Sequence, residues 1–471
     1  MAKKPAILQR HLDKKARHKA QSQARKRLRK ATKSRGQALV EGLFKTLTHF
    51  FPEFFEQLRK LEDCREKSDY ELVEILMAGI AMFLFHQGSR NAFNNTREEE
   101  EFAANYRELF RLRLPHLDTV HNVMCKLSGK ALEHIKCWML RTLLEKKVLH
   151  KQRLMGKWFV VAVDGTGVVS FKEKHCEQCL HRTSKNGKTI YFHNVLEAKL
   201  ITPSGFAISL VTEWIVNPDE YHKQDCERKA FKRLATQLKE LCPRLPICIV
   251  ADGLYPYQGF FDTCHANNWK YIVTLKDGNL PTVWEEVRAL HVLTPEQHSH
   301  DRFIQGNKSI EQAFRWVNGI DYKGHSLNWV ECVETVTNTK SEKQTCTHFV
   351  HVTNLEETTS GNVSMISRAG RLRFKIENEG FNVQKNHGYA MQHKYARVSW
   401  LAAKNYYQCL QIGHLINQLL VLSSDFQSLA QGKVTRQHLW QAMLAFLMYR
   451  CLERSTLDNL LQHRFQIRLI S

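Results

Sequence analysis

The hydrophobic positions of the chain follow two different periods, and the change between them marks the predicted domains. Between residues 37 and 150, apolar residues recur every three or four positions, which is the period of amphipathic α-helices. From residue 157 onward they form short runs rich in valine, isoleucine and aromatic residues, as β-strands do. We therefore predict a helical domain over 37–150 and a strand-rich domain that begins at residue 151.

The strand-rich region has an order of elements that predicts its topology. It reads as four strands, an amphipathic helix, a strand, a short helix and a further strand, at 158–163, 166–171, 189–201, 206–215, 222–241, 246–252, 257–266 and 270–276. This is the order of an RNase H-like α/β fold with a mixed sheet. In such a fold the first strand and the strand after the long helix lie side by side.

The remaining third of the chain changes character twice. Residues 277–365 contain runs typical of antiparallel strands joined by polar turns, so we predict a β-rich insertion there. Residues 366–405 return to a helical pattern and complete the core that 151–276 begins. Residues 406–471 are predicted to form a C-terminal helical region.

The charge of the chain predicts a polyanionic partner. The formal net charge is +22, and residues 1–36 are almost entirely polar and basic. Such a basic arm is expected to be unstructured alone and to order on DNA by contacting phosphates; a solvated tail, or a nuclear address in a eukaryote, would have the same composition. The thirteen cysteines are scattered and odd in number, which favours a reducing compartment. No apolar stretch reaches the roughly 20 residues that cross a bilayer, so we expect a soluble protein with no membrane partner.

Acidic residues at strand ends are the candidate chemistry. Asp164 ends the apolar run WFVVAV, Asp252 ends PICIVA, and each is followed at once by a glycine that permits close approach. Glu377 lies downstream in RLRFKIENEG. Carboxylates are the ligands that Mg²⁺ takes beside substrate phosphates, and two such ions about 4 Å apart support in-line phosphodiester chemistry. We predict that the three acids gather around divalent metal.

These motifs resemble those of bacterial insertion-sequence transposases with an Asp-Asp-Glu triad, in the cut-and-paste group with a β-rich insertion before the glutamate. The resemblance covers roughly residues 155–405 and rests on VAVDGTG, VADGLY and RLRFKIENEG. In that group an arginine stands four residues before the glutamate, as Arg373 does here. The group's lysine about two turns later corresponds to Lys385, one residue late, and Gly370 stands where a tyrosine is usual.

The resemblance implies a function and a set of roles. Asp164, Asp252 and Glu377 would hold two Mg²⁺ ions, with Mn²⁺ as a substitute, and the enzyme would cut DNA at the element's terminal inverted repeats. The freed 3′-hydroxyl would then join target DNA by transesterification. Arg373 and Lys385 would contact DNA near the cut, and paired ends imply a homodimer. Its place would be the bacterial cytoplasm, at the nucleoid.

Two alternatives to this function remain open from sequence. A metal-dependent nuclease of the same fold would cleave without joining, and a transposase-derived DNA-binding protein would do neither. Glu379 competes with Glu377, because helical periodicity places either on a face that could meet the sheet; the arginine offset favours Glu377. Lys394 and Arg397 lie in a basic, aromatic stretch and are predicted to contact the DNA backbone.

Other residues carry weaker signals. The CxxC in HCEQCLH (175–181) suggests zinc, but no second ligand pair stands at the usual distance, so a loop with reducible thiols is the alternative. Glu197, inside an apolar strand, is a candidate secondary metal ligand or lysine partner. Asp225 and Glu227 fit helix-dipole capping. Basic residues around 182–188 suggest a DNA-facing edge. Trp316 and Trp329 are candidates for stacking on a flipped base, although strand tryptophans are commonly core.

Overall fold

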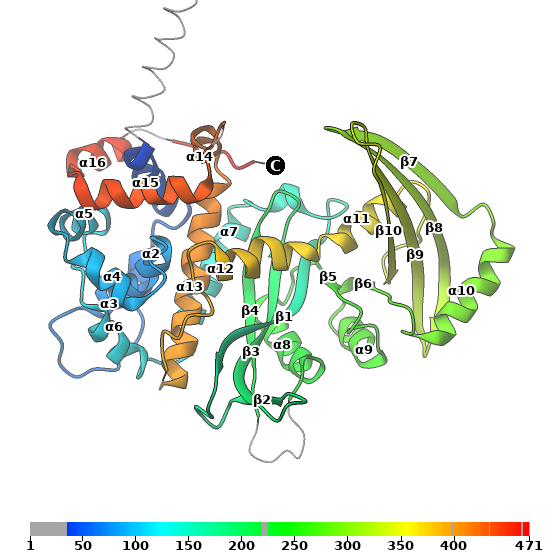
Figure 1. Cartoon of the computed structure of the whole chain (residues 1–471), viewed down its shortest axis with the longest axis horizontal. Coiled ribbons are helices and arrows are strands. Elements are labelled where there is room, and N and C mark those ends of the chain that lie inside the picture. The colour runs from blue at the N-terminus through cyan, green and yellow to red at the C-terminus, as the bar shows by residue number, and fades with distance from the viewer. Residues whose placement is uncertain (1–34, 218–224, 398, 433, 463–464, 471) are drawn as a thin grey trace, which may run out of the picture. The chain divides into compact units, whose positions relative to one another are not determined.

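The chain divides into two compact units that do not follow the predicted boundaries. The computed structural model describes residues 35–217, 225–397, 399–432, 434–462 and 465–470 (Figure 1). Nearly all of the predicted basic arm, residues 1–34, lies outside them. Of the described residues, the helical unit combines 35–61 and 65–120 with the C-terminal part from 416 onward, and the sheet unit comprises 121–415 together with 62–64. The segment 121–150, predicted to belong with the N-terminal helices, therefore groups with the sheet.

The helical unit is built from both ends of the chain. A helix over residues 35–50 precedes α2 (Phe54–Arg59), α3 (Leu72–Leu84), α4 (Arg90–Arg97), α5 (Glu100–Phe110) and α6 (Leu117–Met124), and the C-terminal helices are α14 (Ser424–Leu429), α15 (Arg436–Tyr449) and α16 (Arg454–Gln462). Asn105 of α5 joins the two ends, because its side-chain amide donates to the carbonyls of Leu447 and Arg450. Within the described part of the chain, no helix combines the length and apolarity needed to cross a membrane.

The sheet unit is centred on one mixed sheet with the order β2-β3-β1-β5-β6-β10-β9-β8-β7, and β4 also pairs with β3. The strands are β1 (Phe159–Phe171), β2 (Leu180–Thr183), β3 (Thr189–Ile201), β4 (Ala207–Ile215), β5 (Ile247–Ala251), β6 (Lys270–Thr274), β7 (His298–Gln305), β8 (Lys308–Tyr322), β9 (His325–Asn338) and β10 (Gln344–Thr353). The α/β class is thus confirmed. The two strands predicted at 158–163 and 166–171 are one strand, β1, with a bulge between Gly167 and Val169.

The predicted adjacency of the two aspartate strands is confirmed. β1 pairs in parallel with β5, and β5 pairs in parallel with β6, whereas β1 and β3 are antiparallel. The amphipathic helix α8 (Glu227–Leu241) leads from β4 to β5, and α9 (Gln258–Ala266) leads from β5 to β6. Parallel neighbours need such crossovers, which is why the sequence alternates strand and helix here.

The predicted β-rich insertion continues the central sheet. β7 to β10 form an antiparallel meander, and β10 pairs with β6 through His351, Val352 and Thr353. In Figure 1 these long strands form one wing beside α10 (Pro281–Leu293). Helix α10 and strand β7 were not predicted from the sequence. Because the insertion shares backbone hydrogen bonds with β6, its position is fixed directly by the strand that follows Asp252.

The segment that carries Glu377 lies across the sheet. It comprises α11 (Val363–Arg371), a π-helical turn (Ile376–Phe381) and α12 (Asn382–Asn386), and α13 (Trp400–Val421) follows. Figure 1 shows α11 and α12 crossing in front of the strands. Val363, Ile366, Ala369, Ile376 and Phe381 share one buried cluster with residues of β1 and β5, so apolar burial of several side chains holds this segment in place. The sheet unit also contains α7 (Ala131–Glu145) and a short 3-10 helix at His150–Gln152.

Candidate active site

Asp164 and Asp252 lie at equivalent positions of adjacent parallel strands. The β1–β5 ladder pairs Ala162 with Val250, and each aspartate is two residues further along its strand. Ala162 and Val250 both belong to the buried cluster under α11, and side chains two apart on a strand point the same way. Both aspartates therefore point to the face that carries the segment with Glu377, at a spacing set by neighbouring strands.

Arg373 and Glu377 approach Asp164 from that segment. The Nη1 atom of Arg373 lies 3.2 Å from Oδ2 of Asp164, and both side chains are largely buried. Glu377 is near enough to raise the pKa of Asp164 by charge repulsion. Glu379 instead pairs with Lys375, at 3.2 Å between Nζ and Oε1. Glu377 is therefore the acid of this segment that acts on the charge of Asp164, although the carboxylate oxygens of Asp164, Asp252 and Glu377 do not all lie within 4.8 Å of one another.

The carboxyl group of Asp164 is held in a state that disfavours its charge. Burial raises its pKa to about 6, with further increases from Asp252 and Glu377, while Arg373 and the Gly165 amide act in the opposite direction. Desolvation and like charges both destabilise a carboxylate. A site of this kind carries more negative charge than its own cation balances, and a divalent ion would relieve the imbalance.

Glu227 is a further carboxylate near the two aspartates, on the other face of the sheet, and helix-dipole capping does not account for its raised pKa. It is the first residue of α8, and burial together with Asp164 and Asp252 raises its pKa to about 7. Its carboxyl group lies where a side chain at Gly165 would begin, so any Cβ there would overlap it. Because Gly165 follows Asp164 directly, Glu227 approaches β1 from the opposite face of the sheet.

Gly253, which follows Asp252, leaves room for the cationic side chain of Lys276, as Gly165 leaves room for Glu227. A Cβ at Gly253 would lie 2.7 Å from the side chain of Lys276, and Lys276 Nζ lies 3.7 Å from Oδ2 of Asp252. Each Asp-Gly pair therefore admits one long ionic side chain, Glu227 at the first and Lys276 at the second. In the sequence, the glycine after each aspartate predicts that another group comes close. The sequence does not show that this group is Glu227 at Gly165 and Lys276 at Gly253.

The π-helical turn accounts for the late position of Lys385. A turn closed by i→i+5 bonds holds about one more residue than an α-helical turn. Lys385 is eight residues after Glu377, and the π-turn from Ile376 to Phe381 lies in that interval. The extra residue is absorbed there, so Lys385 returns close to the angular position that seven residues give in a regular helix. Its Nζ lies 5.7 Å from the ring centre of Phe381.

Gly370 stands where no larger residue fits. A Cβ at this position would lie 2.5 Å from the ring of His351 on β10 and 3.0 Å from Ile272 on β6. His351 is 3% exposed, so its ring could not move into solvent without opening the sheet. A tyrosine at this point of α11 is therefore incompatible with the way α11 packs on β6 and β10.

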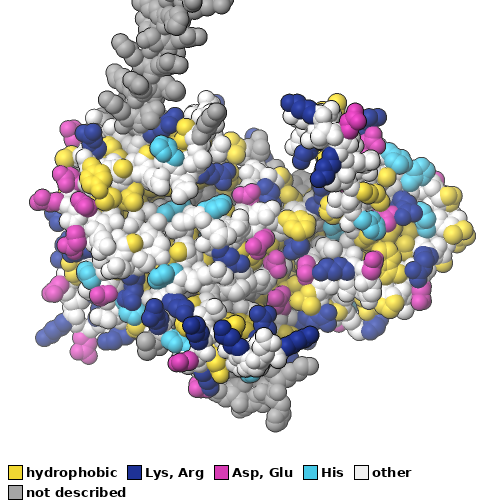
Figure 2. All heavy atoms as spheres, viewed as in Figure 1, with side chains coloured by type: hydrophobic (Ala, Val, Ile, Leu, Met, Phe, Trp, Pro, Cys, Tyr) yellow, Lys and Arg dark blue, Asp and Glu magenta, His cyan; other side chains and the backbone are white. Residues whose placement is uncertain are grey.

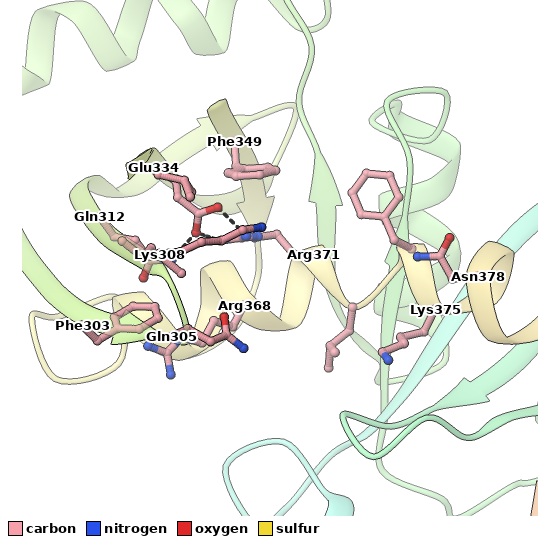
Figure 3. A pocket seen from close by; sticks show the side chains of 14 residues that line it. Phe303, Gln305, Lys308, Gln312, Glu334, Phe349, Arg368, Arg371, Lys375 and Asn378 are labelled. Atoms are coloured by element: carbon pink, nitrogen blue, oxygen red, sulfur yellow. Dashed lines mark hydrogen bonds and ion pairs between the residues drawn. The ribbon is translucent and has the colours of Figure 1, made fainter. Parts of the chain in front are cut away.

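A basic and aromatic pocket of about 570 Å³ lies beside the Glu377 segment, between it and the β-rich insertion (Figure 3). Its lining includes Phe303, Lys308, Glu334, Phe349, Arg368, Arg371, Phe374, Lys375 and Asn378. Arg371 donates to both oxygens of Glu334, at 2.7 and 2.9 Å, and its guanidinium lies 4.2 Å from the ring centre of Phe349. Phe374 is 49% exposed. Cations and open aromatic faces together suit nucleic acid.

The other predicted DNA contacts lie on the loop between α12 and α13. Lys394 and Arg397 are exposed there, and Lys394 Nζ lies 5.2 Å from the ring centre of Phe171 at the end of β1. Arg182, Lys185 and Lys188, in and after β2, are exposed too. Figure 2 shows dark blue side chains gathered over the β2–β3 end of the sheet. None of these five basic residues contacts the carboxylates directly. We call this exposed group, Arg182, Lys185, Lys188, Lys394 and Arg397, the basic margin.

Four further candidate residues have structural roles. Glu197 is fully buried; it accepts from Thr212 and Tyr407 and lies 3.5 Å from Lys199 Nζ, so it is a lysine partner in the core. Asp225 pairs with Arg233 at 2.6 Å. The stacking hypothesis for Trp316 and Trp329 is wrong as far as exposure goes, because these residues are 5% and 3% exposed and cannot present a free ring face.

Comparison of the chain with protein-family models gave no match, and comparison with curated proteins gave none.

Proposed function

We propose that the protein is a DNA transposase of an insertion sequence, with an RNase H-like core, that cleaves element ends and joins them to target DNA. The observation that carries the proposal is the group of carboxylates: Asp164 lies within β1 and Asp252 directly after β5, at equivalent positions where the parallel pairing of the two strands ends, and Glu377 lies on the segment that crosses them. Acids on rigid strands keep the geometry that phosphoryl transfer needs.

The strand order supports the RNase H-like assignment. The part of the sheet before the insertion has the order β4-β3-β1-β5-β6, with β1, β5 and β6 parallel and β3 antiparallel between β4 and β1. Three meandering strands followed by two helix–strand units give this order. The fold by itself hosts many activities, so the site carries the functional argument.

The donor set fits Mg²⁺, or Mn²⁺ in its place. All candidate ligands are carboxylates, which suit hard divalent cations, and burial, followed by repulsion between the acids, raises the pKa of Asp164 and of Glu227, which a bound cation would counteract. Asp164, Asp252 and Glu377 would hold the metal. Two bound ions would activate the attacking oxygen and stabilise the leaving oxygen at the scissile phosphate.

The surrounding residues would position and neutralise DNA. Arg373 pairs with Asp164 and would contact the phosphate beside that carboxylate. Lys385, returned toward the same side by the π-turn, would contact the backbone nearby. Lys394 and Arg397 would hold flanking duplex, and joining two element ends calls for a homodimer of the protein.

The test is an excision and joining assay on a marked segment bounded by the DNA that flanks this gene. We expect the wild type to excise and join it with Mg²⁺. Asp252→Asn should lose both steps yet still bind the DNA, and the matched control Glu379→Gln should retain both. Cleavage without joining in the wild type would identify a nuclease instead. Binding without chemistry in every variant would identify a silent DNA-binding protein.

A further inference from the structure

A second group of potential ligands lies away from the carboxylates, in the loop that leads from β1 to β2. The Sγ atoms of Cys176 and Cys179 are 3.7 Å apart, and each lies 3.4 Å from Nε2 of His193 on β3. Among the described residues, this is the group of histidine, cysteine or acidic side chains whose ligand atoms converge closely enough for a metal ion. Cys179 and His193 are buried, and Cys176 is half-buried.

These separations match the edges of a tetrahedral zinc site. Bond lengths of about 2.3 Å for Zn–S and about 2.0 Å for Zn–N imply about 3.8 Å between two sulfurs and about 3.5 Å between sulfur and nitrogen. The three observed separations, 3.7, 3.4 and 3.4 Å, are close to these values, so a single ion could reach all three atoms. Thiolate and imidazole favour zinc, whereas Mg²⁺ prefers oxygen ligands.

A tight turn and a packed ring hold the three ligand atoms together. The Cys179 amide donates to the Cys176 carbonyl at 3.2 Å, which closes the turn between the two cysteines. On the other side, the ring of His193 packs against Trp400, with 4.3 Å between ring centres. Nδ1 of His193 has no hydrogen-bond partner that would orient the imidazole. The ring is therefore oriented by its packing against Trp400.

We propose that Cys176, Cys179 and His193 bind one Zn²⁺ ion, with a fourth coordination position open to water at the half-buried Cys176 side. The ion would tie the β1–β2 loop to β3, fourteen residues further along the chain from Cys179. That loop precedes the hairpin that carries Arg182, Lys185 and Lys188. The site would thus hold the basic margin in place, by a metal distinct in chemistry from that of the carboxylate cluster.

A competing arrangement uses the same two thiols. Cys176 and Cys179 could join as a disulfide, which requires the sulfurs to approach to about 2.05 Å and leaves His193 without a role. Zinc and disulfide are mutually exclusive at this site. They differ in metal content and in the mass of the peptide that contains both cysteines.

The experiment measures zinc in the full-length protein purified under reducing conditions, by mass spectrometry of the metal. We expect one zinc per chain in the wild type, and loss of it in Cys176→Ser and His193→Gln. Cys346→Ser removes an exposed cysteine on β10 and should keep the ion. Asp252→Asn should keep it also, because the carboxylate cluster is a different site. Folding of the variants is checked by circular dichroism.

Cobalt substitution in the wild type needs no variant. Co²⁺ added to zinc-depleted protein should give the near-ultraviolet charge-transfer band of a thiolate ligand and the intense visible bands of tetrahedral coordination, and both should disappear on adding Zn²⁺. The proposal is overturned if reduced wild type binds neither metal, if bound cobalt lacks the thiolate band, or if a Cys176–Cys179 disulfide forms in protein that never held zinc.

Discussion

The substitution Glu227→Gln tests whether the buried carboxylate of Glu227 lowers the free energy of unfolding of the protein. The pKa of Glu227 rises from an ordinary 4.5 to about 7, chiefly through burial and then through Asp164 and Asp252. At about 1.36 kcal/mol for each pKa unit, the charged form costs the folded state at most about 3 kcal/mol. The true cost is smaller wherever Asp164 shares the proton, because the two groups titrate together.

The sign of the pH dependence follows from the direction of the shift. Between about pH 4.5 and 7 the folded state binds more protons than the unfolded state, so metal-free stability falls as pH rises through this window. Glutamine cannot ionise and occupies nearly the same volume. We therefore expect Glu227→Gln to leave stability at pH 4.5 nearly unchanged and to raise it at pH 8, by up to about 3 kcal/mol.

The assay is urea denaturation in the presence of a chelator at pH 4.5 and pH 8. Glu379→Gln is the matched control, since Glu379 pairs with Lys375 and has a side chain 28% exposed; removing such a surface pair should change stability by under about 1 kcal/mol at either pH. Saturating Mg²⁺ should stabilise the wild type more than Glu227→Gln, because the ion relieves the repulsion that the variant lacks. An equal effect of Glu227→Gln at both pH values would refute the reasoning and return Glu227 to an ordinary helix-capping role.

Further predictions concern the same site and its margin. The affinity for Mg²⁺, measured by calorimetry, should rise from pH 5 to 8 with release of protons, because the pKa of Asp164 is about 6; a flat profile would contradict metal binding by this carboxylate. Gly165→Ala should destabilise the protein by about 1–3 kcal/mol through overlap with Glu227, and adding Glu227→Ala should restore most of the loss in denaturation experiments; strictly additive losses would disprove the contact. Lys394→Gln with Arg397→Gln should reduce the slope of DNA affinity against salt by about 1.8, and an unchanged slope would exclude both from phosphate contact.

Periodicity predicted the central sheet well because its strands are local and strongly patterned. The strand predicted at 189–201 coincides with β3, and the adjacency of β1 and β5 followed from the alternation of strand and helix. The division into units was not predictable in the same way. Asn105 bonds to carbonyls more than three hundred residues away, and no local pattern reports such a contact.

The parts of the site that sequence reasoning missed depend on contacts between distant segments. Glu227 fits a helix cap in the sequence, and only the packing of α8 behind Gly165 brings it to the aspartates. His193 is an isolated histidine in an apolar strand, and nothing in the sequence links it to Cys176 and Cys179. It becomes a possible third metal ligand only because β3 folds beside the loop that holds the two cysteines.

The π-turn at Ile376–Phe381 has a consequence for how this segment could have evolved. A wider turn lets a helix gain or lose one residue while the side chains on either side keep their directions. The number of residues between Glu377 and Lys385 can then change by one during evolution. Deletion of a single residue such as Asn378 should be tolerated, whereas an insertion into the regular turns of α11 should not. A sequence alignment that penalises a gap in this segment would score two related chains as dissimilar even where their side chains occupy the same positions.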